Sequence, residues 1–437
     1  MPIRMGEDPV VIVGLGVEAP GGTVGPGAYW DALAAGWSLL EPLPRDRGWD
    51  LDRLFALPQR PGWGPVPDSG GFLHDATQFD APFFGVSPRE AVAMDPQQRV
   101  AMRVAWTALQ QAGIDPASLV GHGHRAGVFL GVSLSTYGPP IDHPDPILSG
   151  RRFTGALNSS AAGRVSHLLD LRGPCMSLDT ACASSLTALQ QAHNALLLGQ
   201  CEWALTGGIC VISTPAPLVE FSRHRAIDPT GYCRPYSAAA AGTVWGEGAV
   251  VAVVERRSRA RRLGHRVLAE VVSVGSNHNG AGAHLSVPSQ LAQEQLYRQV
   301  LEDTGVTPQE ITMFEGHGTG TAAGDPRELR AIAAVYGQGR DCELVLGSVK
   351  SNLGHAQAAA GFLGLAKVVL AGIHGVIPAS LHADPPSDAI DWDRHGIRVP
   401  AHSTRWQGRR LAAVSTFGVS GSNAHALIDI PEEAFHA

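Results

Sequence analysis

Apolar and polar residues follow one another in a pattern that predicts strands and helices in turn along the chain. β-Branched and apolar runs bounded by glycine predict buried strands over residues 10–14 and 127–133. Small and apolar residues at helical spacing predict a helix over residues 182–198, ended by Gly199. Further strands are predicted at residues 203–212, 249–255, 267–274, 311–314, 344–347, 411–415 and 424–429. Further helices are predicted at residues 29–35, 96–112, 290–304, 326–336 and 356–373, and another opens at the capping segment 87–90.

This alternation runs through both halves of the chain and favours a layered α/β fold. The length of 437 residues exceeds the roughly 250–300 residues that one hydrophobic core usually supports. We therefore expect two fused halves, residues 1–258 and residues 259–437. No sequence repeat is found, so the order of elements alone suggests a duplication. Residues 41–75 are rich in Pro, Gly and Trp and lack periodicity, which predicts a long ordered surface excursion.

The charge balance excludes several kinds of partner. Lysine and arginine number 33 against 40 aspartates and glutamates, a net charge of −7, which argues against nucleic acid or an anionic membrane surface. One stretch departs from this balance, the arginine run Arg256, Arg257, Arg259, Arg261, Arg262 and Arg266. We interpret this run as a solvated connector between two strands, with part of a docking face for an acidic protein as the alternative.

Cysteine usage and the chain start bear on the compartment. The six cysteines show no C-x-x-C pair and no metal-ligand spacing, which is typical of a reduced, cytoplasmic protein without structural zinc. Residues 1–6 contain no apolar segment of the kind a signal peptide needs. No apolar run reaches the roughly 20 residues of a membrane helix, so we expect a soluble protein.

Cys182 stands where an extended segment is predicted to turn into a helix. Free amides and the helix dipole at such an N-terminus favour the thiolate, which attacks acyl groups. The same amides can hold an oxyanion. A buried structural cysteine is the ordinary fate of a free thiol, and this segment alone slightly favours that reading.

Two glycine-flanked histidine loops change the balance. His317 lies in the segment 314–321 after a short predicted strand, and His355 ends the segment 350–355 between a strand and a helix. An isolated loop histidine is more often a surface or satisfied core residue. Together with a cysteine at a helix start, two such loops favour acyl transfer, because imidazole partners a cysteine nucleophile. Both imidazoles can also donate to a thioester or β-keto oxygen and stabilise an enolate.

The segments 179–185, 315–321 and 350–355 resemble the three active-site motifs of β-ketoacyl synthases. They are most similar to the ketosynthase domains of modular polyketide synthases. Supporting matches are spread over the whole chain, in segments 47–52, 71–76, 91–99, 246–248, 391–392 and 415–425. The order and spacing of so many motifs make the resemblance very specific.

The resemblance implies a thiolase-like αβαβα fold of five layers and two related halves, normally a homodimer. Cys182 is then the acylated nucleophile, while His317 and His355 bind the thioester carbonyl of the second substrate and serve in decarboxylation or deprotonation. The backbone amides of Cys182 and Phe417 are expected to form the oxyanion hole, with Phe417 and Gly418 gating the pocket.

The resemblance also implies supporting residues and a substrate carrier. Lys350 supports the network, by pairing with Glu315, and the remaining supporting residues are Thr319, Thr321 and Asn352. No metal or nucleotide cofactor is expected. Acyl groups arrive on the phosphopantetheine of an acyl carrier protein.

Several positions depart from the usual pattern of modular ketosynthases. Ala183 follows the cysteine where serine is common, and Gly316 precedes the histidine where alanine is common, which frees that backbone to resite His317. The segment 236–242 lacks two usual aspartates, and the segment 277–290 is shorter than its counterpart. These departures cluster near the expected pocket.

Three functions therefore stay open. The first is condensation of the Cys182 acyl group with carrier-bound malonyl by decarboxylative Claisen chemistry. The second is intramolecular aldol or Dieckmann-type ring closure with release, in the manner of the free-standing ketosynthase-like cyclase of salinosporamide biosynthesis. The third is a non-catalytic dimeric scaffold. The motifs end close to the chain ends, so we expect either an excised domain or a free-standing enzyme.

The glycines at 14–16 do not open a helix, which excludes a dinucleotide site.

Overall fold

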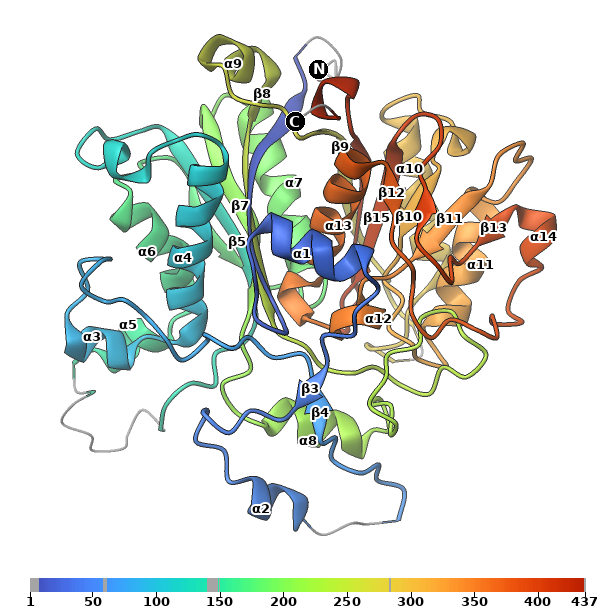
Figure 1. Ribbon diagram of the computed structural model, residues 1–437, viewed down its shortest axis with the longest axis horizontal. Helices are drawn as coiled ribbons and strands as arrows, with labels where there is room; N and C mark the ends of the chain where they lie inside the picture. Colours follow the sequence, from blue (N-terminus) through green and yellow to red (C-terminus); the bar gives the residue numbers. More distant parts are fainter. Residues whose placement is uncertain (1–7, 58–60, 140–147, 149, 283, 436–437) are drawn as a thin grey trace.

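The computed structural model describes residues 8–57, 61–139, 148, 150–282 and 284–435 (Figure 1). Within these ranges the predicted alternation of strands and helices is confirmed. The segment 1–6, where no signal peptide was predicted, lies outside the described residues.

The N-terminal half contributes five strands to one large sheet. They are β1 (Val10–Ala19), β5 (Ala126–Val132), β6 (Cys175–Leu178), β7 (Trp203–Cys210) and β8 (Gly248–Arg256). Their order is β6-β5-β7-β8-β1, with β6, β5 and β7 parallel and β8 antiparallel to its neighbours.

The C-terminal half repeats this arrangement. Its strands are β9 (Ala269–His278), β10 (Met313–Glu315), β11 (Leu344–Gly347), β15 (Leu411–Phe417) and β16 (Ser422–Asp429). Their order is β11-β10-β15-β16-β9, again with three parallel strands followed by an antiparallel one, and β13 (Ile397–Arg398) extends the edge. In both halves the strand order is therefore third, second, fourth, fifth, first. The two copies join where β1 pairs with β9.

Helices cover the sheet in layers (Figure 1). The helices that form the layers are α4 (Pro96–Gln111), α6 (Ser159–Leu168), α7 (Ser184–Leu197), α10 (Gln290–Glu302), α11 (Asp325–Val335) and α13 (Ala360–His374). α4 and α6 pack on the outer face of the first half, α10 and α11 on that of the second, and α7 and α13 lie between the halves. Three buried apolar clusters follow the same division, one central and two outer.

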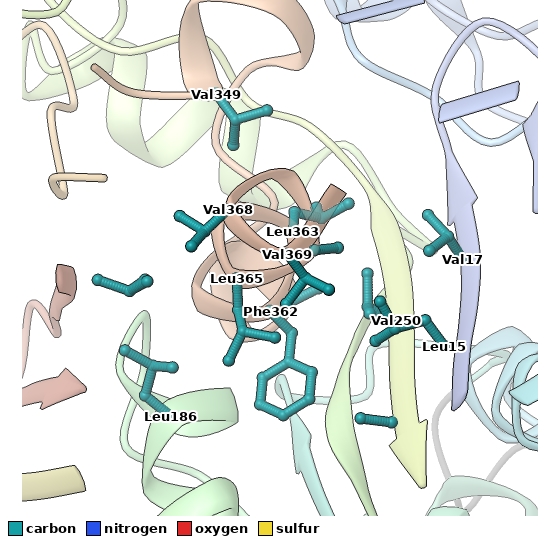
Figure 2. Close-up of a cluster of buried hydrophobic side chains, with 14 of the residues drawn as sticks. Leu15, Val17, Leu186, Val250, Val349, Phe362, Leu363, Leu365, Val368 and Val369 are labelled. Atoms are coloured by element: carbon teal, nitrogen blue, oxygen red, sulfur yellow. The ribbon is translucent and has the colours of Figure 1, made fainter. Parts of the chain in front are cut away.

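α13 is the central core helix. Figure 2 shows its Phe362, Leu363 and Val369 surrounded by apolar side chains of β1, β8 and α7. Glycine allows the close approach, because a Cβ on Gly361 would lie 2.8 Å from Leu186 Cγ. Residues 357–374 are long and apolar enough to cross a membrane by length and composition alone, with a mean hydropathy of 1.4. Since 83% of that window is buried inside the protein, this segment belongs to the core.

Smaller elements complete the chain. The helices are α1 (Pro26–Ala34), α2 (Leu51–Phe55), α3 (Pro88–Ala93), α5 (Arg152–Ala156), α8 (Ala216–Arg223), α9 (Arg257–Leu263), α12 (Lys350–Leu353) and α14 (Trp392–His395), and the strands are β2 (Thr23–Val24), β3 (Glu41–Pro42), β4 (Ser69–Gly70), β12 (Val376–Ile377) and β14 (Thr404–Arg405). The described part of the predicted surface excursion carries β3, α2 and β4 and lies beside α8 (Figure 1).

The arginine run forms α9 and its flanks, between β8 and β9. Arg256 pairs with Asp8 at 3.3 Å, and Arg257 pairs with Glu270 at 3.2 Å. Arg259 pairs with Glu255 one turn earlier. These pairs within the chain favour the connector interpretation over a docking face. Sequence periodicity did not predict this helix, because α9 is short and strongly charged.

Candidate active site

A strained turn places Cys182 between β6 and α7. Ala181 has a φ of 54°, in the left-handed region that disfavours a side chain. Ser184 closes the turn, since its hydroxyl accepts from Thr180 N–H at 2.8 Å and donates to Ala181 O at 2.6 Å. Asp179 accepts from Ala181 N–H at 2.9 Å. The helix begins at Ser184, so the predicted helix start at Cys182 is two residues early.

His355 reaches Cys182 from the other half of the molecule. It follows α12 and Gly354, and its own N–H donates to Val244 O at 2.6 Å. Its Nδ1 accepts from Gln357 N–H at 3.1 Å, so in the neutral ring the proton sits on Nε2. That Nε2 lies 3.0 Å from Cys182 Sγ. His355 Nε2–H is therefore the donor of this hydrogen bond, and Cys182 Sγ is the acceptor.

His317 completes the constellation at the end of β10. Its ring centroid lies 5.3 Å from that of His355 at an interplanar angle of 86°, and 5.4 Å from that of Phe417. Its backbone N–H donates to Glu328 at 2.6 Å. Its Nδ1 is buried and has no hydrogen-bond partner within the described ranges. The structure thus brings together the three residues that sequence spacing alone could not place.

Burial dominates the ionisation of these groups. It raises the pKa of the Cys182 thiol to about 11, against which the charge of Lys350 and the amides of Val419 and Cys182 act. The neighbouring amides act in the expected direction, towards the thiolate, but burial outweighs them in the resting site. Burial, followed by the Lys350 charge, holds the pKa of His317 and of His355 well below the usual value. Both rings are consequently neutral at pH 7.

The second amide beside the sulfur is that of Val419. The backbone N–H groups of Val419 and of Cys182 itself lower the pKa of the Cys182 thiol. The N–H of Gly418 donates to Ser422 O at 2.6 Å, in the turn between β15 and β16. The predicted oxyanion hole joins Cys182 to Phe417, whereas the neighbouring amide that acts on the Cys182 thiol is that of Val419. Phe417 instead packs its ring against His317. The motif gave no signal for this shift, because the turn register decides which amide faces the sulfur.

Glu315 pairs with a lysine that the motifs do not contain. Lys367 of α13 donates to Glu315 Oε2 at 2.7 Å, and Val349 N–H donates to Oε1 at 2.6 Å. Both members of the pair are buried. The ion pair of Glu315 is thus with Lys367, whereas Lys350, for which the pairing was predicted, interacts with Glu315 through its charge. Lys350 is itself buried and acts on Cys182 and both histidines through its charge. A lone lysine inside an apolar predicted helix was the available signal for Lys367.

The other supporting residues anchor loops. Thr319 and Thr321 hydroxyls lie 3.1 Å apart, and Thr321 Oγ1 accepts from Gly324 N–H at 3.1 Å. Asn352 donates to Trp37 O at 3.0 Å, so it ties α12 to the segment after α1. The sequence did not point to the buried Glu328, whose carboxylate accepts a hydrogen bond from His317 N–H and so holds the His317 loop.

Family comparison agrees with this architecture. Residues 7–260 match the family described as beta-ketoacyl synthase, N-terminal domain, and residues 268–384 match beta-ketoacyl synthase, C-terminal domain. The chain is 46% identical over 435 residues to a phenolphthiocerol synthesis polyketide synthase type I of Mycobacterium bovis, covering 97% of this chain and 20% of the relative. It is 44% identical over 430 residues to a pikromycin polyketide synthase component of Streptomyces venezuelae, covering 97% of this chain and 11% of the relative.

Solved structures agree on the fold. An oxazolomycin ketosynthase domain of Streptomyces albus superposes with a TM-score of 0.89 at 36% identity, covering 97% of this chain and 74% of that one. The ketosynthase from module 6 of the bacillaene synthase of Bacillus subtilis gives 0.88 at 32% identity, with 97% and 72% covered. The thiolase-like α/β prediction is confirmed. The chain spans about a fifth or less of the length of these curated relatives.

Proposed function

The chain belongs to the β-ketoacyl synthase family of acyl-transferring condensing enzymes, and we propose that it elongates carrier-bound acyl chains in polyketide biosynthesis. One observation carries the proposal. A cysteine sulfur from one half of the molecule lies 3.0 Å from an imidazole nitrogen of the other half, with a second imidazole 5.3 Å from the first ring. This arrangement suits a nucleophile that accepts an acyl group and two donors that then stabilise an enolate.

In the proposed first step, Cys182 sulfur attacks the thioester carbonyl of an acyl group on the phosphopantetheine of a carrier protein. The developing oxyanion is held by the N–H groups of Cys182 and Val419, both of which already favour negative charge on the Cys182 sulfur. The tetrahedral intermediate collapses by breaking the bond to the pantetheine sulfur. That sulfur leaves with the proton lost by the Cys182 thiol. His355 Nε2–H stabilises negative charge on Cys182 sulfur during the exchange.

In the second step, a malonyl thioester takes the place of the departed carrier. His317 and His355 donate to its thioester carbonyl while the carbon–carboxylate bond breaks and CO₂ leaves, which produces an enolate. The enolate carbon attacks the Cys182 thioester carbonyl and the carbon–sulfur bond breaks. The released thiolate is reprotonated. Neutral rings suit this role, because each retains an N–H donor while adding no charge to the buried site. The reaction draws on no metal or nucleotide cofactor.

We also propose that the protein forms a homodimer. β6 lies at the edge of the main sheet, and edge strands offer unpaired backbone groups to a second chain. Met176 on β6 is 42% exposed, and Leu134, just beyond the neighbouring β5, is 74% exposed. We expect Met176→Lys to convert a dimer to a monomer in light-scattering chromatography, while Leu291→Lys, at an exposed position of α10, leaves the mass unchanged. We place the protein in the cytoplasm.

The proposal is tested by intact mass spectrometry in two stages. Incubation with an acyl-pantetheine thioester should add one acyl group, which Cys182→Ala abolishes and the exposed-cysteine control Cys342→Ala retains. Adding malonyl-carrier protein should then discharge the adduct as an elongated product. Discharge without malonyl that yields a cyclic product would mean ring closure and would overturn the proposal, as would an adduct that persists in Cys182→Ala.

A further inference from the structure

The residue directly before His317 must be glycine, because the hydroxyl of Tyr236 occupies the space that a side chain at Gly316 would fill. A Cβ at Gly316 would lie 1.9 Å from the hydroxyl oxygen of Tyr236 and 3.1 Å from its Cζ. It would also lie 2.9 Å from Glu328 Oε1. Gly316 is absent from the glycines with positive φ, so its backbone conformation is open to any residue. The space, and not the backbone, excludes a methyl group here.

Tyr236 is held firmly in that space. The side chain is fully buried in the cluster beneath α10 and α11. Its N–H donates to Asp325 at 2.8 Å, and its carbonyl accepts from Ser387 N–H at 2.8 Å, which fixes a left-handed φ of 61°. The phenol therefore cannot move away easily if the opposite backbone gains an atom.

The Tyr236 hydroxyl has no hydrogen-bond partner within the described ranges of the chain. It also lies 3.0 Å from the point that a Gly318 Cβ would occupy. The phenol thus touches the backbone on both sides of His317. Its contribution at this place is volume, because no hydrogen bond holds the oxygen there.

Glu328 grips the same loop by hydrogen bonds. Its two carboxylate oxygens accept from His317 N–H at 2.6 Å and from Gly318 N–H at 2.9 Å. The carboxylate is buried, which raises its pKa to about 7. The His317 backbone is therefore held between the carboxylate of Glu328 and the phenol of Tyr236.

We propose that Tyr236 is a positioning residue for His317 and that Gly316 is its matched partner, left without a side chain to admit the phenol oxygen. The inference rests on the proposed function, since that function assigns to His317 the activation of the malonyl thioester. A methyl group at Gly316 and the hydroxyl of Tyr236 each contribute one heavy atom to the same place. Exchanging the two should conserve the packed volume and return His317 to its position.

A four-protein cycle tests this: wild type, Gly316→Ala, Tyr236→Phe and the double variant. We expect Gly316→Ala to lower the malonyl-dependent kcat about a hundredfold, the loss that a displacement of about 1 Å produces. Acylation of Cys182 should stay within a few-fold of wild type, because the hydrogen bond to the sulfur comes from His355. Tyr236→Phe should lose only a few-fold, and the double variant should recover to within a few-fold of wild type.

Gly163→Ala is the matched control, because Gly163 lies in α6 and a Cβ there meets nothing within 4 Å. The proposal is overturned if the double variant is as slow as Gly316→Ala, or if Gly316→Ala matches Gly163→Ala. Equal losses of acylation and condensation in Gly316→Ala would mean general damage and would also overturn it.

A second readout separates this inference from the proposed function. The ring resonances of His317 in ¹⁵N-histidine-labelled protein, assigned with a His317→Asn variant, should move in Gly316→Ala and return in the double variant. This holds even if wild type shows no malonyl-dependent turnover, an outcome that would reject the proposed function alone. Unmoved His317 resonances in Gly316→Ala would reject the matched pair.

Discussion

In both halves of the sheet the third strand leads to a central helix, but the residue delivered there differs. In the N-terminal half, β6 leads through one turn to Cys182 and then α7. In the C-terminal half, β11 leads through α12 to His355 and then α13. The two positions meet with Nε2 and Sγ 3.0 Å apart. A related scaffold used twice has thus produced a nucleophile in one copy and a hydrogen-bond donor in the other.

The two central helices differ in how deeply they are held. Every residue of α13 from Ala360 to Gly372 is buried, and its Lys367 pairs with Glu315 inside the core. α7 buries one face and exposes Asn194 on the other. The helix that follows His355 is therefore buried along its length as far as Gly372. Since Cys182 and His355 come from different halves, the site exists only between them, and a change in either half should affect catalysis.

The largest expected effect separates the two imidazoles. We expect His355→Ala to slow both Cys182 acylation and condensation, the latter about 100- to 1,000-fold, because it removes a preorganised donor. His317→Ala should slow condensation about a hundredfold and leave acylation within a few-fold. Single-turnover mass spectrometry measures both steps. Equal effects of the two variants on acylation would break the assignment of the sulfur contact to His355.

Removing one member of the buried ion pair between Lys367 and Glu315 should destabilise the fold. Lys367→Met leaves the Glu315 carboxylate buried without its partner, and we expect a loss of about 3–5 kcal/mol in the free energy of unfolding. Chemical denaturation measures the loss. Lys367→Met combined with Glu315→Gln should recover part of it. A loss below about 1 kcal/mol in the single variant would contradict the assigned pairing.

The smallest effect concerns the turns before the two helices. The C-terminal copy has Gly354 at a φ of 77°, whereas the N-terminal copy has Ala181 at a φ of 54°. Ala181→Gly relieves the left-handed strain at the cost of chain entropy, so we expect a stability change within about 1 kcal/mol and an unchanged fold. Thermal unfolding measures it. Gly354→Ala, the reciprocal change, should destabilise more, and a smaller loss than that of Ala181→Gly would contradict the comparison.

The sequence predicted most strands and helices because each follows a clear apolar period with glycine or capping residues at its ends. It also predicted Cys182, His317 and His355, which stand in segments with strong motifs. It did not predict the partner of Glu315, because Lys367 lies outside the motifs and its only signal is a single lysine in an otherwise apolar helix. The amide of Val419 and the contact between Gly316 and Tyr236 depend on turn register and tertiary approach. The thiol pKa depends on burial, which no local motif encodes.

The central claim is that an imidazole from one half activates the sulfur of the other. The rate of Cys182 alkylation by iodoacetamide against pH tests it directly, in a Cys175→Ala/Cys342→Ala background that removes the exposed thiols. The pKa of about 11 means that the thiolate is scarce at pH 7, so the rate should rise about tenfold per pH unit up to the pKa. The account predicts that His355→Ala lowers the rate at least about tenfold at pH 8, through the loss of a hydrogen bond to the charged form. An unchanged rate in His355→Ala would contradict it.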